Sequence, residues 1–185
     1  MKQSEIDTLI KNVLPSLINA GWDIEKDVAF EVTLTDGQMI NNGSNYIRSE
    51  KKRADIVLYL QPDVPLAVIE VKKSSKSVQE GIQQAIKYSE MLDVPFIFSS
   101  NGKGYIYRNE FDLEELEKKL KMDQFPKKDE LINLYKIHKN IEDGDLLLQS
   151  PKYKKNKPRY FQLSAINRTL KAISDGQKRL LLVLA

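Results

Sequence analysis

Two carboxylates and one ammonium stand in the two apolar runs between residues 54 and 72. Asp55 lies in the run ADIVLYL, while Glu70 and Lys72 lie at the end of the run LAVIEVK. Unpaired charge is expensive to bury in strands that are otherwise apolar. Charges at these positions therefore indicate a functional site, and two acids with one lysine suit hydrolysis at a metal ion.

The two runs flank a turn (QPDVP) and are predicted to pair as antiparallel strands. A register with Tyr59 opposite Leu66 also places Asp55 opposite Glu70. Side chains alternate along a strand, so Lys72 falls on the same face as Glu70. Opposed acids about 5 Å apart between their β-carbons repel each other unless a cation lies between them.

This arrangement suits Mg²⁺, because two carboxylates, water and the phosphate oxygens of a substrate make a hard, octahedral shell. The ion would lower the pKa of a bound water and offset charge on the phosphate. Lys72 would orient or help deprotonate that water and stabilise the developing negative charge. The reaction is hydrolysis of a phosphodiester. The alternative is a salt bridge between Lys72 and one of the acids without catalysis, because D-x(14)-E-x-K alone is a weak pattern.

Composition narrows the chemistry. The chain has 185 residues, with 29 Lys and Arg, 26 Asp and Glu, one His and no Cys. The lack of Cys excludes disulfides, thiolate metal sites and a Cys nucleophile, and the single His138 excludes a multi-His zinc site and is predicted to be structural. No apolar run approaches the ~20 residues of a membrane span, and the N-terminus lacks a signal-peptide core. We expect no membrane partner and a cytoplasmic location.

Two helices are predicted beside these strands, at 4–20 and 77–92, from their apolar periodicity. Gln84 and Tyr88 lie one turn apart on the second helix and therefore on one side of it. There they can hold a phosphate, a base or the neighbouring lysine; the alternative is a polar helix flank. Gly81 permits close approach of the helix backbone to a strand or to DNA.

Other charged residues flank the same strands. Glu5 in the first helix is either a further carboxylate directed at the metal or an acid that interacts with the helix dipole. Five basic side chains are expected to contact DNA phosphates, although each alone is typical of an ordinary surface: Lys51, Lys52, Arg53, Lys73 and Lys76.

The first 110 residues predict an α/β fold with a central mixed sheet. Strands are predicted at 28–34, 54–60, 66–72, 94–99 and 105–107. Asp36-Gly37 is a turn signal before a return strand that starts at 38–40. The polar stretch 41–53 predicts a loop.

Beyond residue 110, helices are predicted at 110–121, 129–139 and 160–175, followed by a buried strand at 179–185. The window 151–160 (PKYKKNKPRY) carries four Lys and one Arg without an acid. It is typical of a linker or of a segment that contacts phosphates. A buried strand at the end of the chain cannot complete a core, so we expect a fragment of a longer protein.

The stretch RADIVLYL–PLAVIEVKKSSKSVQEGIQQAIKYSEMLDVPFIFSSNGKGY resembles the N-terminal nuclease domain of the restriction (R) subunit of type I restriction–modification enzymes. That domain belongs to the PD-(D/E)-x-K nuclease superfamily. The opening helix SEIDTLIKNVLPSLINAGW, the early turn LTDG and the segment MDQFP extend the resemblance. Ala54 stands where the proline of the superfamily name would be.

The resemblance implies roles for residues at matching positions. Asp55 and Glu70 would be the metal ligands and Lys72 the catalytic lysine. Gln84 and Tyr88 would form the Q-x-x-x-Y element of this nuclease branch, near the site of DNA cleavage. Glu5 also matches, as the first-helix acid of related nucleases.

The resemblance also implies three parts: a restriction-endonuclease-like nuclease domain over 1–110, a helical and basic linker over 111–157, and the start of a RecA-like motor domain over 158–185. The last part resembles a superfamily 2 helicase-like translocase, in which Arg159 and Gln162 occupy adenine-contacting positions. The phosphate-binding loop of such motors is absent from the chain. We therefore expect ATP use by the full-length subunit only.

The function implied is a Mg²⁺-dependent endonuclease that cuts duplex DNA non-specifically after ATP-driven translocation by the full-length subunit. Its implied partners are the methyltransferase (M) and specificity (S) subunits. Two alternatives remain open: a nuclease-fold domain of another restriction or repair enzyme, and a DNA-binding module that does not cut on its own.

Overall fold

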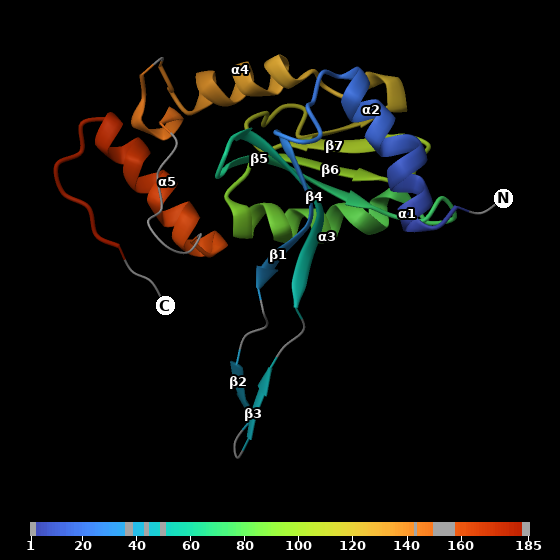
Figure 1. The fold of residues 1–185 in the computed structure, drawn as a ribbon, viewed down its shortest axis with the longest axis horizontal. Coiled ribbons are helices and arrows are strands. Elements are labelled where there is room, and N and C mark those ends of the chain that lie inside the picture. The colour runs from blue at the N-terminus through green and yellow to red at the C-terminus, as the bar shows by residue number, and fades with distance from the viewer. Residues whose placement is uncertain are drawn as a thin grey trace.

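A six-stranded mixed sheet forms the centre of the protein. The computed structural model describes residues 3–35, 39–42, 45–48, 51–142, 144–149 and 158–182 (Figure 1). The strands of the sheet, in spatial order, are β1 (Val28–Thr35), β4 (Lys52–Gln61), β5 (Val64–Val71), β6 (Phe96–Ser100), β7 (Tyr105–Asn109) and β8 (Glu117–Leu120). Strands β5 and β6 are parallel and the other neighbours are antiparallel, which confirms the predicted mixed sheet.

Helices lie on both faces of this sheet. The predicted helix over 4–20 is confirmed as three consecutive segments: α1 (Glu5–Thr8), the π-helical η1 (Leu9–Val13) and α2 (Leu14–Asn19). The later helices are α3 (Val78–Leu92), the 3₁₀ turn η2 (Met122–Gln124), α4 (Lys128–His138), the 3₁₀ turn η3 (Leu146–Leu148) and α5 (Tyr160–Ser174). Among the described residues, no helix has the length and apolar character needed to cross a membrane.

The central strands are apolar on both faces, as predicted, because each face is covered. Val57 and Val68 belong to the cluster under α3, together with Ile82. Ile56 and Ile69 belong to the opposite cluster, with side chains of α2 and α4. Figure 1 shows α3 on one side of the sheet and α2 and α4 on the other.

Helix α3 is the crossover that joins the parallel strands β5 and β6, and it lies very close to the sheet. Ser99 Oγ on β6 donates a hydrogen bond of 2.8 Å to the carbonyl of Val78. A β-carbon at Gly81 would lie 2.2 Å from Oγ of Ser99 and 3.3 Å from Cγ of Lys72. The expected close approach of the helix backbone to a strand is therefore confirmed, and a larger residue at 81 requires Ser99 to move.

The predicted helix over 110–121 is wrong. Asp112 Oδ1 accepts hydrogen bonds from the N–H groups of Glu114 and Glu115, which makes a turn, and 117–120 form the edge strand β8. The run has many helix-favouring charged residues, but pairing with the open edge of β7 overrides this local preference.

Two other stretches also differ from expectation. Residues 41–53 contain strand rather than loop alone: β2 (Met39–Asn42) pairs with β3 (Asn45–Arg48), and β4 starts at Lys52. Asp36-Gly37 lies outside the described residues. No strand forms at 179–182, where Leu181 is 88% exposed, and 183–185 lie outside the described residues. An apolar run becomes a strand only where a partner strand pairs with it.

Helix α5, confirmed over the predicted range, is held against the main sheet by polar contacts. Arg168 donates from Nε and Nη2 to both carboxylate oxygens of Asp93, at 2.8 and 2.7 Å. Asn167 Nδ2 donates to the carbonyl of Asp63 in the β4–β5 turn at 3.0 Å. The C-terminal end of α3 and the central hairpin therefore both contact α5.

The close approach at Gly81 predicts an effect on stability. We expect Gly81→Ala to lower the free energy of unfolding by about 1–3 kcal/mol, because the methyl group displaces Ser99 and moves α3 away from the sheet. Urea denaturation measures this. The matched control is Gln83→Ala on the exposed face of α3, which is expected to be neutral or stabilising. Equal or higher stability of Gly81→Ala would contradict the steric argument.

Candidate active site

The central hairpin brings the two predicted acids together. Three pairs keep the predicted register: Ile56 with Ile69, Val57 with Val68, and Leu58 with Ala67. The same register, continued by one residue, places Asp55 opposite Glu70. Near the turn the register shifts, so that Tyr59 lies opposite Pro65 and not opposite Leu66 as predicted.

Glu70 is the most buried charged group of the site, with 2% of the residue exposed. Its Oε1 accepts a hydrogen bond of 2.7 Å from Nζ of Lys72, whereas its Oε2 is buried and has no hydrogen-bond partner. Asp55 Oδ2 accepts a hydrogen bond of 2.7 Å from the N–H of Val71. The structure therefore brings Asp55, Glu70 and Lys72 together, as their alternation predicted.

The two polar residues of α3 extend this network. Gln84 Oε1 accepts a hydrogen bond of 2.9 Å from Nζ of Lys72, and Gln84 Nε2 donates one of 2.8 Å to the hydroxyl of Tyr88. Gln84 was predicted to hold a phosphate, a base or the neighbouring lysine, and in the structure it contacts the lysine. Lys72 is thus held between a strand carboxylate and a helix amide.

Burial dominates the electrostatics of the site. Burial, followed by the negative charge of Asp55, raises the pKa of Glu70 to about 8. Burial also raises the pKa of Asp55, against the hydrogen bond from Val71 and the charge of Lys72. Burial lowers the pKa of Lys72, but the hydrogen bond and charge of Glu70 outweigh it and leave that pKa above its usual value. Lys72 is therefore an ammonium group at neutral pH.

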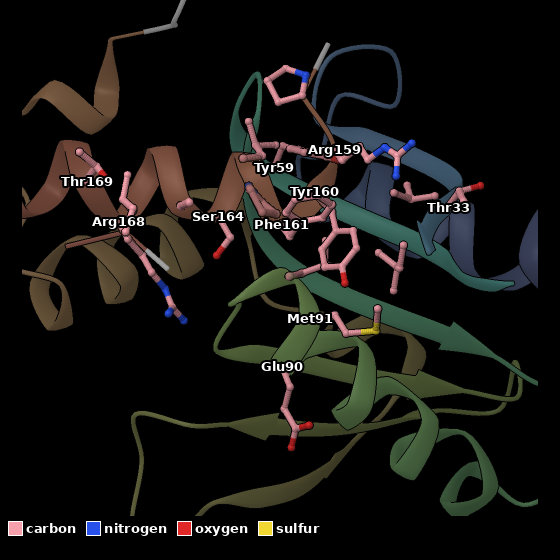
Figure 2. A pocket seen from close by; sticks show the side chains of 18 of the residues that line it. Thr33, Tyr59, Glu90, Met91, Arg159, Tyr160, Phe161, Ser164, Arg168 and Thr169 are labelled. Atoms are coloured by element: carbon pink, nitrogen blue, oxygen red, sulfur yellow. The ribbon is translucent and has the colours of Figure 1, made fainter. Parts of the chain in front are cut away.

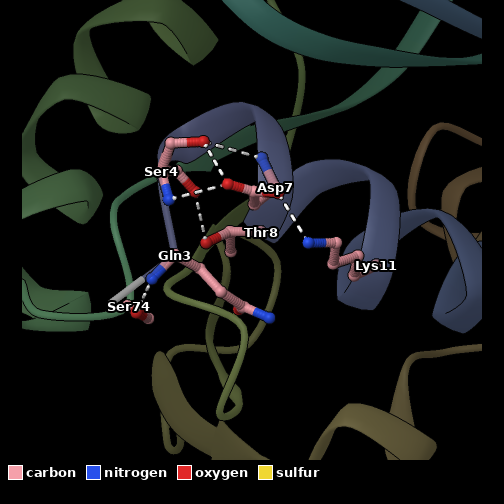
Figure 3. Close-up of polar contacts among 6 residues, drawn as sticks. All are labelled: Gln3, Ser4, Asp7, Thr8, Lys11 and Ser74. Carbon is pink, nitrogen blue, oxygen red and sulfur yellow. Dashed lines mark hydrogen bonds and ion pairs between the residues drawn. The ribbon is translucent and has the colours of Figure 1, made fainter. Parts of the chain in front are cut away.

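Glu5 lies near this network because the start of the chain is tied to the loop after Lys72. The N–H of Gln3 donates to Oγ of Ser74 at 2.9 Å, and Ser4 caps α1 through the N–H of Asp7 at 3.0 Å (Figure 3). The charge of Glu5 contributes to the raised pKa of both Asp55 and Lys72. Both of its predicted roles remain predictions.

Arg53 and Lys76, which are predicted to contact phosphates, each pair with an acid. Arg53 Nη1 lies 2.5 Å from Oε2 of Glu31, and Lys76 Nζ lies 2.8 Å from Oε2 of Glu80. Lys51, Lys52 and Lys73 are exposed as well. Their contact with DNA stays a prediction.

Sequence reasoning missed two residues beside the site. Glu31 lies between the pairs Phe30↔Ile56 and Val32↔Ala54, hence across from Asp55, and its charge helps to raise the pKa of Asp55. Its φ of 53° is unusual for a non-glycine residue, and no sequence signal marks it. Ser99 was also missed, although two serines at the end of the apolar run PFIFSS were a visible signal.

The donor set fits a hard cation. Among the described residues no three His, Cys, Asp or Glu side chains could hold a metal together. Mg²⁺ commonly binds through only one or two carboxylates and takes its other ligands from water and substrate phosphates. Asp55 and Glu70 would supply these two carboxylates, and the partnerless Oε2 of Glu70 is the acceptor that such an ion would satisfy.

Comparison with known proteins agrees with this geometry. The family model described as "Type I restriction enzyme R protein N terminus" matches residues 14–116. This chain belongs to that family. It is 42% identical to the type I restriction enzyme EcoAI endonuclease subunit of Escherichia coli, over 98% of the chain and 23% of that protein. It is also similar, with a TM-score of 0.83 and 35% identity, to a fragment described as an HsdR subunit of a type I restriction enzyme from Vibrio vulnificus YJ016, covering 97% of the chain and 34% of that structure. The chain thus spans about a quarter of the length of its curated relative.

In this member of the R protein family, a cavity of about 1130 Å³ lies between β1, the end of α3 and α5, and neither Asp55 nor Glu70 lines it. Figure 2 shows three residues that line this cavity, Arg159, Tyr160 and Thr33. Arg159 lines the cavity, but Gln162 does not: its Oε1 accepts from the N–H of Arg159 at 3.0 Å and so caps α5. A role of either residue in contacting adenine stays a prediction.

The buried Glu70 predicts a pH-dependent stability in this R-protein domain. Without metal, folded Glu70 keeps a proton that the unfolded chain loses, because its pKa is about 8 instead of 4.5. The free energy of unfolding should therefore fall between about pH 5 and pH 8, on the order of 3 kcal/mol in total. Urea denaturation in EDTA measures this slope.

Added Mg²⁺ should recover stability at pH 8, because a cation favours the ionised carboxylates. Glu70→Gln should leave only the smaller slope that the raised pKa of Asp55 contributes, and should weaken the response to Mg²⁺. The control is Glu80→Gln on the exposed start of α3, which should keep both. A slope in Glu70→Gln that equals the wild-type slope would contradict the assignment of the buried proton to Glu70.

Proposed function

We propose that this chain is the Mg²⁺-dependent nuclease domain of a type I restriction enzyme R subunit and hydrolyses phosphodiester bonds of duplex DNA. The observation that carries the proposal is the carboxylate of Glu70. One of its oxygens holds Lys72 and the other is buried without a partner, beside the second acid Asp55. The name of the Escherichia coli relative, an endonuclease subunit, supports the same activity.

Mg²⁺ held by Asp55 and Glu70 would lower the pKa of a water and offset the charge on the phosphate. The residues of the chain position the other groups. The N–H of Val71 orients Asp55, and Glu70 fixes the ammonium of Lys72. Because Lys72 stays protonated, it is suited to stabilising negative charge on the phosphate and to orienting the water. Its raised pKa disfavours a role as the base that removes the proton.

Gln84 and Tyr88 position Lys72 from the helix side. Tyr88 is fixed by packing, since it is 8% exposed, and Gly81 keeps α3 close to the sheet. Because Lys72 Nζ donates to Gln84 as well as to Glu70, its position is fixed from two sides. The ammonium therefore stays at one place beside the two acids.

The remaining parts of the family's function are also proposals for this protein. The full-length subunit would use ATP to translocate DNA and would cut non-specifically, in a complex with methyltransferase and specificity subunits. We propose a nuclease body, a linker and then the start of a RecA-like motor domain. Because β8 pairs with β7 and Leu131 of α4 lies in the core, we place the nuclease body through α4.

Removal of the Asp55 carboxylate or of the Lys72 ammonium should strongly reduce DNA cleavage. In the full-length enzyme with Mg²⁺ and ATP, we expect Asp55→Ala and Lys72→Ala to reduce duplex DNA cleavage by a factor of about 10² or more. Both variants should keep ATP-dependent translocation, which separates loss of the nuclease from loss of folding. Gel assays of linearised plasmid measure cleavage, and a triplex-displacement assay measures translocation.

A matched control is Lys119→Ala on the exposed edge strand β8, which should cut like the wild type. Persistent cleavage by Asp55→Ala or Lys72→Ala would contradict the site assignment. It would also favour the alternative of a nuclease-fold module that binds DNA and leaves cutting to another site.

The positioning role of Gln84 predicts a graded effect. Gln84→Ala leaves Lys72 with Glu70 as its only side-chain partner in the network, so we expect the cleavage rate to fall about 10-fold to 100-fold. Tyr88→Phe keeps the packing and removes only the hydroxyl, and its effect should be smaller. Single-turnover cleavage at saturating DNA measures the rate, and a larger loss in Tyr88→Phe would contradict this order.

A further inference from the structure

Two neighbouring loops leave the sheet at the end where the acids lie. Strands β5 and β6 are parallel and their last residues, Val71 and Ser100, are paired, so the loops that follow them start side by side. The loop after β5 begins with Lys72, the lysine of the candidate site. We call residues 73–76 and 101–104 together the rim.

The rim is basic, whereas the opposite end of the same strands is acidic. The charged residues of the rim are Lys73, Lys76 and Lys103, without an acid. Lys76 pairs with Glu80, but Lys73 and Lys103 are exposed and form no ion pair within the described part of the chain. The turns at the other end hold six acids and no base, and two of these acids pair with arginines: 61–64, 93–95 and 110–116. This polarity favours the approach of a polyanion at the end that carries the rim.

Hydrogen bonds fix the backbone of the rim beside the candidate site. The N–H of Lys72 donates to the carbonyl of Ser100 at 2.8 Å, and Nδ2 of Asn101 donates to the carbonyl of Lys76 at 2.8 Å. Asn101 is 7% exposed, and its Oδ1 accepts from the N–H of Lys103 at 3.2 Å. Asn101 therefore joins the two loops and orients the backbone at Lys103.

The start of the chain supports both loops. Gly102 has a φ of 81°, and a β-carbon there would lie 3.0 Å from Cγ2 of Thr8 and 3.1 Å from Oδ1 of Asn12. The N–H of Gln3 donates to Oγ of Ser74 at 2.9 Å (Figure 3), and the N–H of Ser74 donates to the carbonyl of Gln3 at 3.4 Å. A backbone held in this way needs little further ordering when a ligand binds.

The rim lies within reach of the phosphates next to the one that is cut. Lys73 directly follows Lys72, and the chain from Ser100 to Lys103 spans at most about 11 Å. Each strand of B-DNA carries a phosphate about every 3.4 Å along the helix axis. A duplex with one phosphate at the two acids would therefore bring the neighbouring phosphates past both lysines of the rim that lack an acidic partner.

We propose that the rim binds the phosphate backbone of duplex DNA beside the phosphate that is cut, through Lys73 and Lys103. This inference rests on the proposed nuclease function. It adds Lys103, on the turn between β6 and β7, to the basic residues expected from the sequence. Hydroxyl groups commonly join lysines in phosphate contacts, and the exposed Ser75 stands between Lys73 and Lys76. The rim positions DNA and takes no part in the chemical step.

The test measures DNA binding by full-length subunits that cannot cut. Asp55→Ala is present in every protein, and fluorescence anisotropy with a 40-base-pair duplex gives Kd at several salt concentrations. The test variant adds Lys73→Gln with Lys103→Gln. It should bind about 10-fold more weakly, and the slope of log Kd against log salt concentration should fall by about 2, because two phosphate contacts are lost. Lys73→Arg with Lys103→Arg keeps both charges and should keep Kd and slope.

The matched control removes two exposed lysines elsewhere, by Lys26→Gln with Lys127→Gln. Lys26 precedes β1, whose first residue pairs with Leu58 near the β4–β5 turn. Lys127 precedes α4, on the face of the sheet away from α3 (Figure 1). This pair should change neither Kd nor slope. A photo-crosslinking amino acid at position 103 should link to the duplex, whereas the same amino acid at position 127 should not.

Equal Kd and slope in the rim variant and the control would overturn the proposal, as would loss of assembly with partner subunits at unchanged DNA affinity. The latter result would make the rim a protein interface. Because binding is read in proteins that cannot cut, failure of the nuclease assignment would appear in the cleavage assays and failure of the rim proposal in these affinities.

Discussion

Glu70 is a carboxylate that folding removes from water, and the geometry of the site follows from that. It lies on β5, a strand whose eight residues are all buried. A buried carboxylate must be paired, hydrogen-bonded or protonated. Lys72 satisfies one oxygen, while the second oxygen and nearby Asp55 leave a concentration of negative charge that a cation would neutralise. We propose that a divalent ion bound at these two acids would offset the cost of burying them.

Helix α3 connects this strand to the rest of the protein. Since β5 and β6 are parallel, the chain must cross the sheet between them, and α3 makes that crossing. Gly81 against Ser99 sets its distance from the sheet, which puts Gln84 within 2.9 Å of Lys72. At the other end, Asp93 is held by Arg168 of α5. The positioning residues thus lie on a helix that is fixed at both ends.

The two edges of the sheet explain most of the incorrect predictions. At one edge, the charged run before residue 121 pairs with β7, and its lysines suit an exposed edge strand. Beyond the other edge, the stretch predicted as a loop contains β2 and β3, which pair with each other. Residues 179–182 are apolar but meet no partner strand among the described residues. In each case a neighbouring strand, present or absent, decided the outcome.

The sequence by itself determined which side chains share a face. Alternation along two strands and a turn rich in proline are local properties, so the register that joins Asp55 to Glu70 and the helix that carries Gln84 and Tyr88 were predictable. Only the tertiary structure decided how these groups interact. The depth of Glu70, its partnerless Oε2 and the bond from Lys72 to Gln84 depend on α2, α3 and α4 covering both faces at once. Burial and close approach are properties of all the packed elements together, and no local pattern encodes them.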